Sequence, residues 1–155
     1  MLYRLVVGLI AAVGLFVVAV PALAGPPETT TTIQKDLVET FVDVVPSCEG
    51  GPPYLVTTTS NFVNHETAFA DGRFHGTFTQ TGSVVAVPLE DPSLPSFTGH
   101  FTVWGGFNAN GTTVNGTFTF NVRLVGSDGS KVTNHLVEHF NVRPDGSVNE
   151  FFRCH

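Results

Sequence analysis

Two glutamates near the C-terminal end of the chain have the spacing that best suits chemistry. Glu138 and Glu150 each have apolar residues two positions away on both sides, so each interrupts an alternating apolar pattern. A hairpin through Pro144-Asp145-Gly146 sets the two carboxyl groups diagonal to each other, about 7 to 8 Å apart between backbones. Burial and mutual repulsion would raise the pKa of at least one carboxyl, as expected of a general acid or a ligand anchor. In the alternative, both acids lie in water at the rim of the sheet.

Histidines flank the first of these glutamates. His135 and His139 surround Glu138 in the spacing H-x-x-E-H, which binds zinc in proteases when a helix carries it. In a strand the two imidazoles stand about 13 Å apart, too far for one ion. The expected strand pairing predicts one polar row across four strands: His100, Asn121, His135 and His155. His135 opposite His155 is the one metal candidate, and zinc sites usually gather three or four ligands, so we expect no metal.

Seven alternating segments must position these side chains. Segments rich in Thr, Val and Phe predict strands at 33–45, 54–69, 73–87, 96–107, 112–125, 131–142 and 147–155. Helical periodicity is absent after the first 24 residues. We expect an all-β, antiparallel up-and-down meander of about 7 to 8 strands that closes into a barrel. A β-sandwich is the alternative.

Turn chemistry sets how the strands pair. Three connections share an Asp-Gly ending: Ala70-Asp71-Gly72, Ser127-Asp128-Gly129 and Pro144-Asp145-Gly146. That ending suits a three-residue loop with glycine in the left-handed conformation, and Asn110-Gly111 suits a two-residue turn. These loops predict the following opposite pairs: Phe120 with Leu136, Val142 with Val148, Phe101 with Phe120 and Val103 with Phe118.

One face of this sheet is apolar and is expected to line the barrel interior. Its expected ligand-binding side chains are Glu66, Phe101, Phe118, Phe120, Glu138, Phe140, Glu150 and Phe152. Asn64 points inward with Glu66 if the first Asp-Gly hairpin follows the same rule. The opposite face is rich in Thr, Asn and His and carries Trp104.

The first 24 residues have the composition of a secretory signal peptide. Arg4 precedes an apolar run over 5–20, and the segment ends in Ala22-Leu23-Ala24, an A-x-A cleavage site. We expect cleavage after Ala24 and an extracellular protein that is not embedded in a membrane. The rest divides into a flexible Thr/Pro-rich tether over 25–32 and one domain over 33–155.

Cys48 and Cys154 are the only two cysteines, so an oxidising compartment predicts one disulfide between them. Closing a loop of about 100 residues stabilises a fold by roughly 4 to 5 kcal/mol in the chain-entropy model. The chain has 13 acidic and 7 basic residues without a basic run, which argues against nucleic acid as a partner. An unpaired edge strand would allow a homodimer.

The second half of the chain resembles a group of known sequences. The runs FTGHFTVWGGFN at 97–108, NGTFTF at 115–120 and GSDG at 126–129, with the terminal Cys154-His155, resemble small secreted actinobacterial proteins of unknown function. The strand pattern also resembles the allene oxide cyclase-like and lipocalin-like (calycin) β-barrels, which enclose apolar ligands. The lipocalin G-x-W signature is missing, and no cyclase active-site residue maps onto this sequence. The resemblance therefore implies a ligand-enclosing barrel without a stated activity.

Taken together, the sequence favours a secreted small β-barrel that binds a small apolar or amphipathic ligand in a Phe-lined interior, without a cofactor. One alternative is a solid extracellular or envelope interaction module that uses Trp104 and the Thr-rich face. Another is an isomerase or cyclase-type enzyme in which Glu138 and Glu150 move protons. We expect a binding protein rather than an enzyme.

Overall fold

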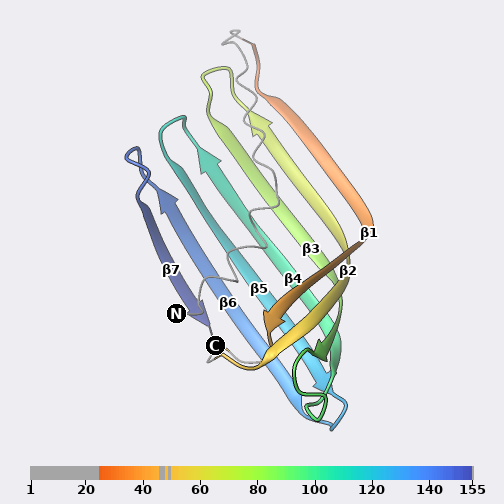
Figure 1. The fold of residues 1–155 in the computed structure, drawn as a ribbon. Helices are drawn as coiled ribbons and strands as arrows, with labels where there is room; N and C mark the ends of the chain where they lie inside the picture. The colour runs from red at the N-terminus through yellow and green to blue at the C-terminus, as the bar shows by residue number, and fades with distance from the viewer. Residues whose placement is uncertain (1–24, 46–47, 49, 155) are drawn as a thin grey trace.

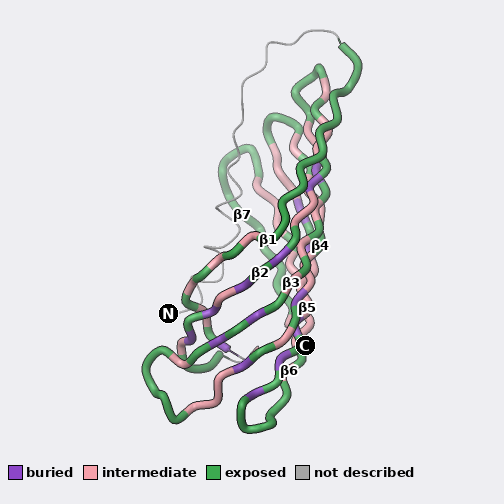
Figure 2. The backbone as a smooth tube through the Cα atoms, turned by 90° about the vertical axis from the view of Figure 1, so that its right-hand side faces the viewer, coloured by how far each residue is buried: buried purple, intermediate pink, exposed green. Residues whose placement is uncertain are grey.

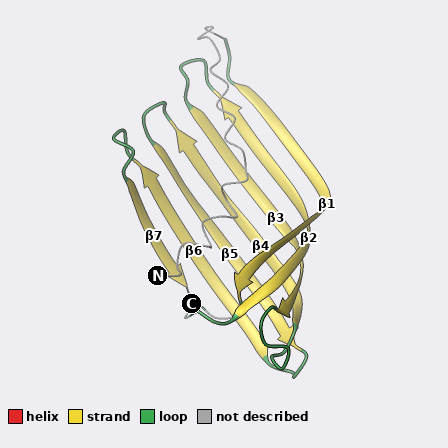
Figure 3. Cartoon of the chain, viewed as in Figure 1, coloured by secondary structure: helices red, strands yellow, loops and turns green. Residues whose placement is uncertain are grey.

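The chain folds into one antiparallel β-sheet whose strands follow one another in sequence order (Figure 1). The computed structural model describes residues 25–45, 48 and 50–154, so the expected signal peptide and His155 lie outside the described residues. The strands are β1 (Glu28–Val44), β2 (Pro53–Ala68), β3 (Phe74–Pro88), β4 (Phe97–Ala109), β5 (Val114–Gly126), β6 (Lys131–Val142) and β7 (Val148–Cys154). The described residues contain strands and loops but no helix (Figure 3). The expected all-β antiparallel meander is therefore confirmed.

The sheet is open rather than closed. β1 and β7 form its two edges, and within the described part of the chain they do not pair with each other. Closure into a barrel requires that pairing, so the structure supports the meander without the ring.

β1 begins earlier than the sequence indicated. Its first residues, 28–34, pair with residues 62–68 of β2, so most of the expected flexible tether over 25–32 is strand. The physical reason lies in the threonines, which favour extended backbone and form cross-strand hydrogen bonds. Thr29 Oγ1 lies 3.0 Å from Thr67 Oγ1, and Thr31 Oγ1 lies 2.8 Å from His65 Nδ1.

A β-bulge bends β1 near its middle. The pairing with β2 shifts between Gln34 and Leu37, and Asp36 adopts a positive φ of 53°. The backbone N–H of Asp36 donates to Asn61 Oδ1 at 3.3 Å, which holds this unusual conformation. Bulges increase local bending, and the second half of β1 turns across the sheet (Figure 1).

The bend divides the sheet into two parts. We call residues 37–45, 48, 50–60, 82–101 and 122–134 the curled half, and residues 28–34, 62–80, 103–120 and 136–154 the open half. The curled half shows two layers of backbone, whereas the open half is a single layer (Figure 2). The buried apolar core lies in the curled half: Val45, Tyr54, Val56, Val84, Ala86, Phe97, Phe101, Val122 and Leu124.

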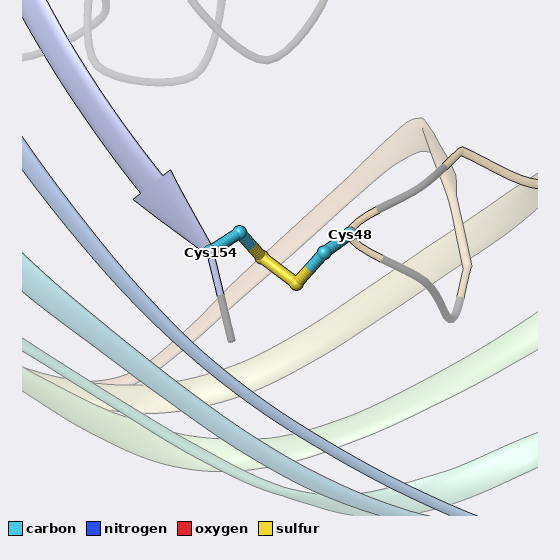
Figure 4. The surroundings of a disulfide bond; sticks show 2 residues. All are labelled: Cys48 and Cys154. Carbon is cyan, nitrogen blue, oxygen red and sulfur yellow. A yellow bond between two sulfur atoms is a disulfide. The ribbon is translucent and has the colours of Figure 1, made fainter.

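A disulfide joins the two sides of the sheet. Cys48, between β1 and β2, bonds to Cys154 at the end of β7, with a Cα–Cα distance of 5.6 Å (Figure 4). The expected bridge is thus confirmed. It links β7 to the connection between β1 and β2, and no backbone pairing between β1 and β7 is present in the described residues.

The Asp-Gly hairpins have the expected geometry. Gly72, Gly129 and Gly146 have φ values of 82°, 84° and 79°, the left-handed conformation that suits glycine. The pairings of Phe120 with Leu136 and of Val142 with Val148 are confirmed.

The Asn110-Gly111 turn is longer than expected. Ala109 pairs with Val114, which leaves four residues between the strands instead of two. Asn110 Oδ1 accepts hydrogen bonds from the backbone N–H groups of Thr112 at 3.3 Å and Thr113 at 2.9 Å, which keeps both threonines in the turn. The expected pairs of Phe101 with Phe120 and Val103 with Phe118 are therefore wrong. The observed pairs are Phe101 with Val122 and Val103 with Phe120, and this two-residue shift leaves every side chain on its expected face.

Candidate functional site

The inner face of the sheet is the face that carries the buried core, and in the open half it forms a chequered surface of Phe and Gly. One row across the strands is Glu66, Gly76, Phe107, Gly116, Phe140 and Glu150. The adjacent row is Asn64, Phe78, Gly105, Phe118, Glu138 and Phe152. Each row thus places phenylalanine and glycine between polar groups on β2 and carboxyl groups on β6 and β7.

The glycines explain why the rings lie flat. A methyl group in place of the Gly76 hydrogen would lie 2.6 Å from ring carbons of Phe107, and one on Gly116 would lie 2.6 Å from ring carbons of Phe140. Each ring therefore covers the glycine on the neighbouring strand, an arrangement in which the aromatic side chain compensates for the missing one. The rings of Phe74 and Phe107 stack at 5.5 Å between centroids. The result is a smooth aromatic surface.

Glu138 and Glu150 meet at one end of this surface, at the expected register. Glu138 lies between Phe118 and Phe152, and Glu150 lies opposite Phe140. Burial first, and then repulsion from Glu150 and a hydrogen bond between the two carboxyl groups, together raise the pKa of Glu138 from 4.5 to about 7. Near neutral pH the Glu138 carboxyl is therefore partly protonated. A role for this proton in binding or turnover stays a prediction.

Asn64 and Glu66 lie at the other end, on β2. Asn64 Nδ2 donates a hydrogen bond of 2.7 Å to Glu66 Oε1. Asn64 is only 7% exposed, and its Oδ1 has neither a hydrogen-bond partner nor contact with solvent. A buried acceptor without a donor costs about 1 to 3 kcal/mol. The alternation of β2 places Asn64 inward, but nothing in the sequence shows that its carbonyl lacks a partner.

The remaining candidate residues divide between the two halves. Phe101 belongs to the core of the curled half, and its ring lies 6.0 Å from that of Phe120, which packs against that core. Phe118 is buried in the open half, Phe140 is half-buried, and Phe152 is 45% exposed. Phe101 and Phe120 therefore support the fold, whereas the other candidates form the chequered surface.

The predicted polar row of histidines is only partly present. His100 lies opposite Arg123 rather than Asn121, because of the longer Asn110 turn. His135 does lie opposite Asn121, with 2.6 Å between Nδ1 and Oδ1, while His155 falls outside the described residues. Within the described part of the chain, no three His, Cys, Asp or Glu side chains gather as a metal site would require.

The H-x-x-E-H spacing lies in β6, as expected for a strand. Residues 135 and 139 have odd numbers and point to the outer face, whereas Glu138 points to the inner face. The glutamate and the imidazoles thus cannot act on one ion, and zinc-protease chemistry has no geometric basis in this strand.

A hollow of about 290 Å³ lies at the tips of the hairpins. It is open to solvent and is lined by Phe69, Arg73, Phe74, His75, Asn108, Ala109, Asn110, Thr113 and Asn115. The Arg73 guanidinium carbon lies 5.0 Å from the centre of the Phe69 ring, at the edge of this hollow. None of the predicted ligand-binding residues lines it.

Comparison of the chain with family models, curated proteins and solved structures finds no match. In the residues that the structure describes, no helix is long and apolar enough to cross a membrane.

Proposed function

We propose that this chain is a secreted binding protein whose inner face, in the open half, holds a small apolar or amphipathic ligand. The observation that carries the proposal is the chequered surface, in which aromatic rings remain half-exposed between polar groups at both ends. Covering such a surface gains about 25 cal/mol per Å² of apolar area removed from water. The polar groups at its ends would orient the ligand, as a few placed polar groups do in ligand sites.

The curled half contributes the closed end of this site. In our proposal the sheet acts as an incomplete barrel, closed by the core and by the Cys48–Cys154 disulfide at one end and open at the other. The apolar signal-like segment and the disulfide both support an extracellular location. The calycin-like resemblance, which implies a closed barrel, remains part of the proposal.

The test uses the mature, oxidised protein purified from its secretion medium. Native mass spectrometry before and after organic extraction reports a co-purifying compound, and titration with the neutral apolar dye N-phenylnaphthylamine reports an open apolar surface. Phe140→Gln places an amide within the chequered surface, whereas the matched His139→Gln changes the next residue, on the outer face. We expect Phe140→Gln to weaken dye binding about tenfold and His139→Gln to leave it unchanged.

The second candidate is a solid interaction module. The flat packing of Phe107 over Gly76 and of Phe140 over Gly116 favours it, because little space remains between the rings and the sheet. A mass without any extractable compound, together with equal dye binding by Phe140→Gln and His139→Gln, would contradict the ligand-binding proposal and support this candidate.

A further inference from the structure

Charged side chains are sorted between the two faces of the sheet. Outside the bulge, the carboxylates of the described strands all lie on the inner face: Glu28, Glu39, Asp43, Glu66, Glu138 and Glu150. The cations and histidines of the paired strand positions lie on the outer face: Arg123, Lys131, Arg153, His65, His75, His100, His135 and His139. At the paired strand positions, the aromatic surface therefore has carboxylates and no cations beside it, and Arg73 lies at a hairpin tip, where it contacts Phe69.

The inner face also has hydrogen-bond acceptors that lack donors. Asn64 Oδ1 and Thr58 Oγ1 are both buried and unpartnered, and both lie on the inner face of β2. The amide of Asn64 already uses Nδ2 to bind Glu66, so its free capacity is that of an acceptor. A ligand that donates hydrogen bonds at this place would remove an existing cost.

Aromatic rings lie beside Asn64 and Glu66. Glu66 is opposite Gly76, and the ring of Phe107 covers that glycine, while Asn64 is opposite Phe78. Ring faces attract cations, most strongly where water is excluded. A carboxylate, an unpaired amide oxygen and aromatic rings together match the needs of an organic ammonium group.

We propose that the ligand of the inner face is an amphipathic organic cation, with a primary ammonium group at Asn64 and Glu66 and an apolar body on the chequered surface. This inference rests on the proposed binding function and names its ligand class. The ammonium donates to Asn64 Oδ1 and to the Glu66 carboxylate, and the body extends over Phe107 and Phe140 toward Glu138. Because Asn64 Oδ1 is out of contact with solvent, its amide or a neighbouring ring rotates when the ammonium enters.

The first experiment compares four probes that share one alkyl chain, below their micelle concentrations. Dodecylammonium, dodecyltrimethylammonium, dodecanol and dodecyl sulfate each compete with N-phenylnaphthylamine on the oxidised mature protein at neutral pH and low salt. We expect dodecylammonium to bind about tenfold tighter than dodecanol, and dodecyl sulfate to bind most weakly. Dodecyltrimethylammonium has the charge without the N–H donors, so its affinity should fall between those of dodecylammonium and dodecanol.

Two variants locate the ammonium. Glu66→Gln removes the charge, and Asn64→Leu removes the acceptor at similar volume; each should lower the preference for dodecylammonium over dodecanol about tenfold while dodecanol affinity stays the same. His65→Gln, between them on the outer face, is the matched control and should change neither affinity. If Asn64→Leu does not fold, the probe comparison on the unmodified protein and on Glu66→Gln still tests whether an ammonium group binds at Glu66.

The outcomes separate this inference from the function on which it rests. Equal displacement of the dye by dodecanol, dodecyl sulfate and dodecylammonium would overturn the cation assignment and leave an apolar binding site. Dye binding that Phe140→Gln does not weaken would overturn the binding function itself.

Discussion

The curled half and the open half use the same kinds of residue with opposite results. On the inner face of the curled half, Phe97 is 3% exposed because a second layer of strand covers it; in the open half, Phe152 is 45% exposed. Both halves have Phe and Gly on alternate strands, so composition does not set the difference. The bend of β1 at Asp36 contributes to the difference, because the second half of β1 turns across the sheet (Figure 1), and the position of Phe152 on the edge strand β7 contributes as well. The buried core that stabilises the fold is thus concentrated in the curled half, and the exposed aromatic surface lies in the open half.

The largest predicted effect concerns the Cys48–Cys154 disulfide, which ties the end of β7 to the connection between β1 and β2. Replacing Cys48 and Cys154 together by alanine should lower the free energy of unfolding by roughly 4 kcal/mol, because the unfolded chain loses a long covalent loop. Urea denaturation of the oxidised protein and of the double variant measures the loss. A loss below about 1 kcal/mol would mean that the strands alone hold the curled half.

Matched truncations of phenylalanine compare the two halves directly. Phe97→Ala removes a ring from the core, where it lies 5.8 Å from the ring of Tyr54, and should cost about 3 to 4 kcal/mol. Phe107→Ala removes a half-exposed ring and should cost about 1 to 2 kcal/mol. Denaturation curves of both variants give the two values. Equal costs would show that the open half is covered in solution.

Matched glycine substitutions compare the backbone of the two halves. A methyl group on Gly99 would collide with the backbone carbonyl oxygen of Arg123 and lie 2.9 Å from the Leu124 Cα, so Gly99→Ala should destabilise the protein by about 2 kcal/mol. In Gly76→Ala the three atoms nearest to the methyl group all belong to the Phe107 ring, which can rotate away, so the cost should stay below about 1 kcal/mol. Thermal melts of the two variants report the difference, and the reverse order would show that the chequered surface is the more rigid.

The smallest predicted effect is a pH dependence that arises in the open half. The pKa of Glu138 is raised from 4.5 to about 7 in the folded protein, so folding binds a proton between these values and stability from this group falls as the pH rises from 4.5 through 7. Because Glu138 is only partly buried, solvent screening reduces the expected fall to about 1 kcal/mol.

Glu138→Gln should abolish this fall, so that the variant becomes more stable than the unmodified protein at pH 8 but not at pH 5. Urea denaturation at the two pH values measures it. Glu90→Gln, in the exposed connection after β3, is the control and should keep the fall. Burial also raises the pKa of Asp43, which is present in every variant and cancels in the comparison. A parallel pH dependence in Glu138→Gln would exclude this carboxyl as the source.

The strands and most of their registers follow from local chemistry. Alternation of apolar residues identifies the faces, and an Asp-Gly ending fixes a three-residue loop because glycine accepts a positive φ. The length of the Asn110-Gly111 turn was predicted wrongly, because the Asn110 side chain accepts hydrogen bonds from the backbone of Thr112 and Thr113. The Asn-Gly dipeptide alone does not reveal these bonds.

The unpaired edges of the sheet and the hydrogen bonding of individual buried groups could not be predicted in the same way. Alternation within each strand does not show whether β1 and β7 pair, and it does not show the bend at Lys35-Asp36, where neither residue is a usual signal for a bulge. The inward position of Glu138 and Glu150 was predictable from alternation, and the unpartnered Asn64 carbonyl was not, because satisfaction of a polar atom depends on neighbours from several strands.

The disulfide also changes the connectivity of the molecule. From Cys48 to Cys154 the backbone and the sulfur bridge form one covalent ring that includes β2 to β7. A protease that cuts one hairpin within this ring opens it without releasing a fragment, and two cuts are needed before any strand can leave. Among the described strands, only β1 lies outside the ring, so one cut between β1 and Cys48 would leave it held by its ladder with β2 and by side-chain contacts such as that of Glu39 with Gln80.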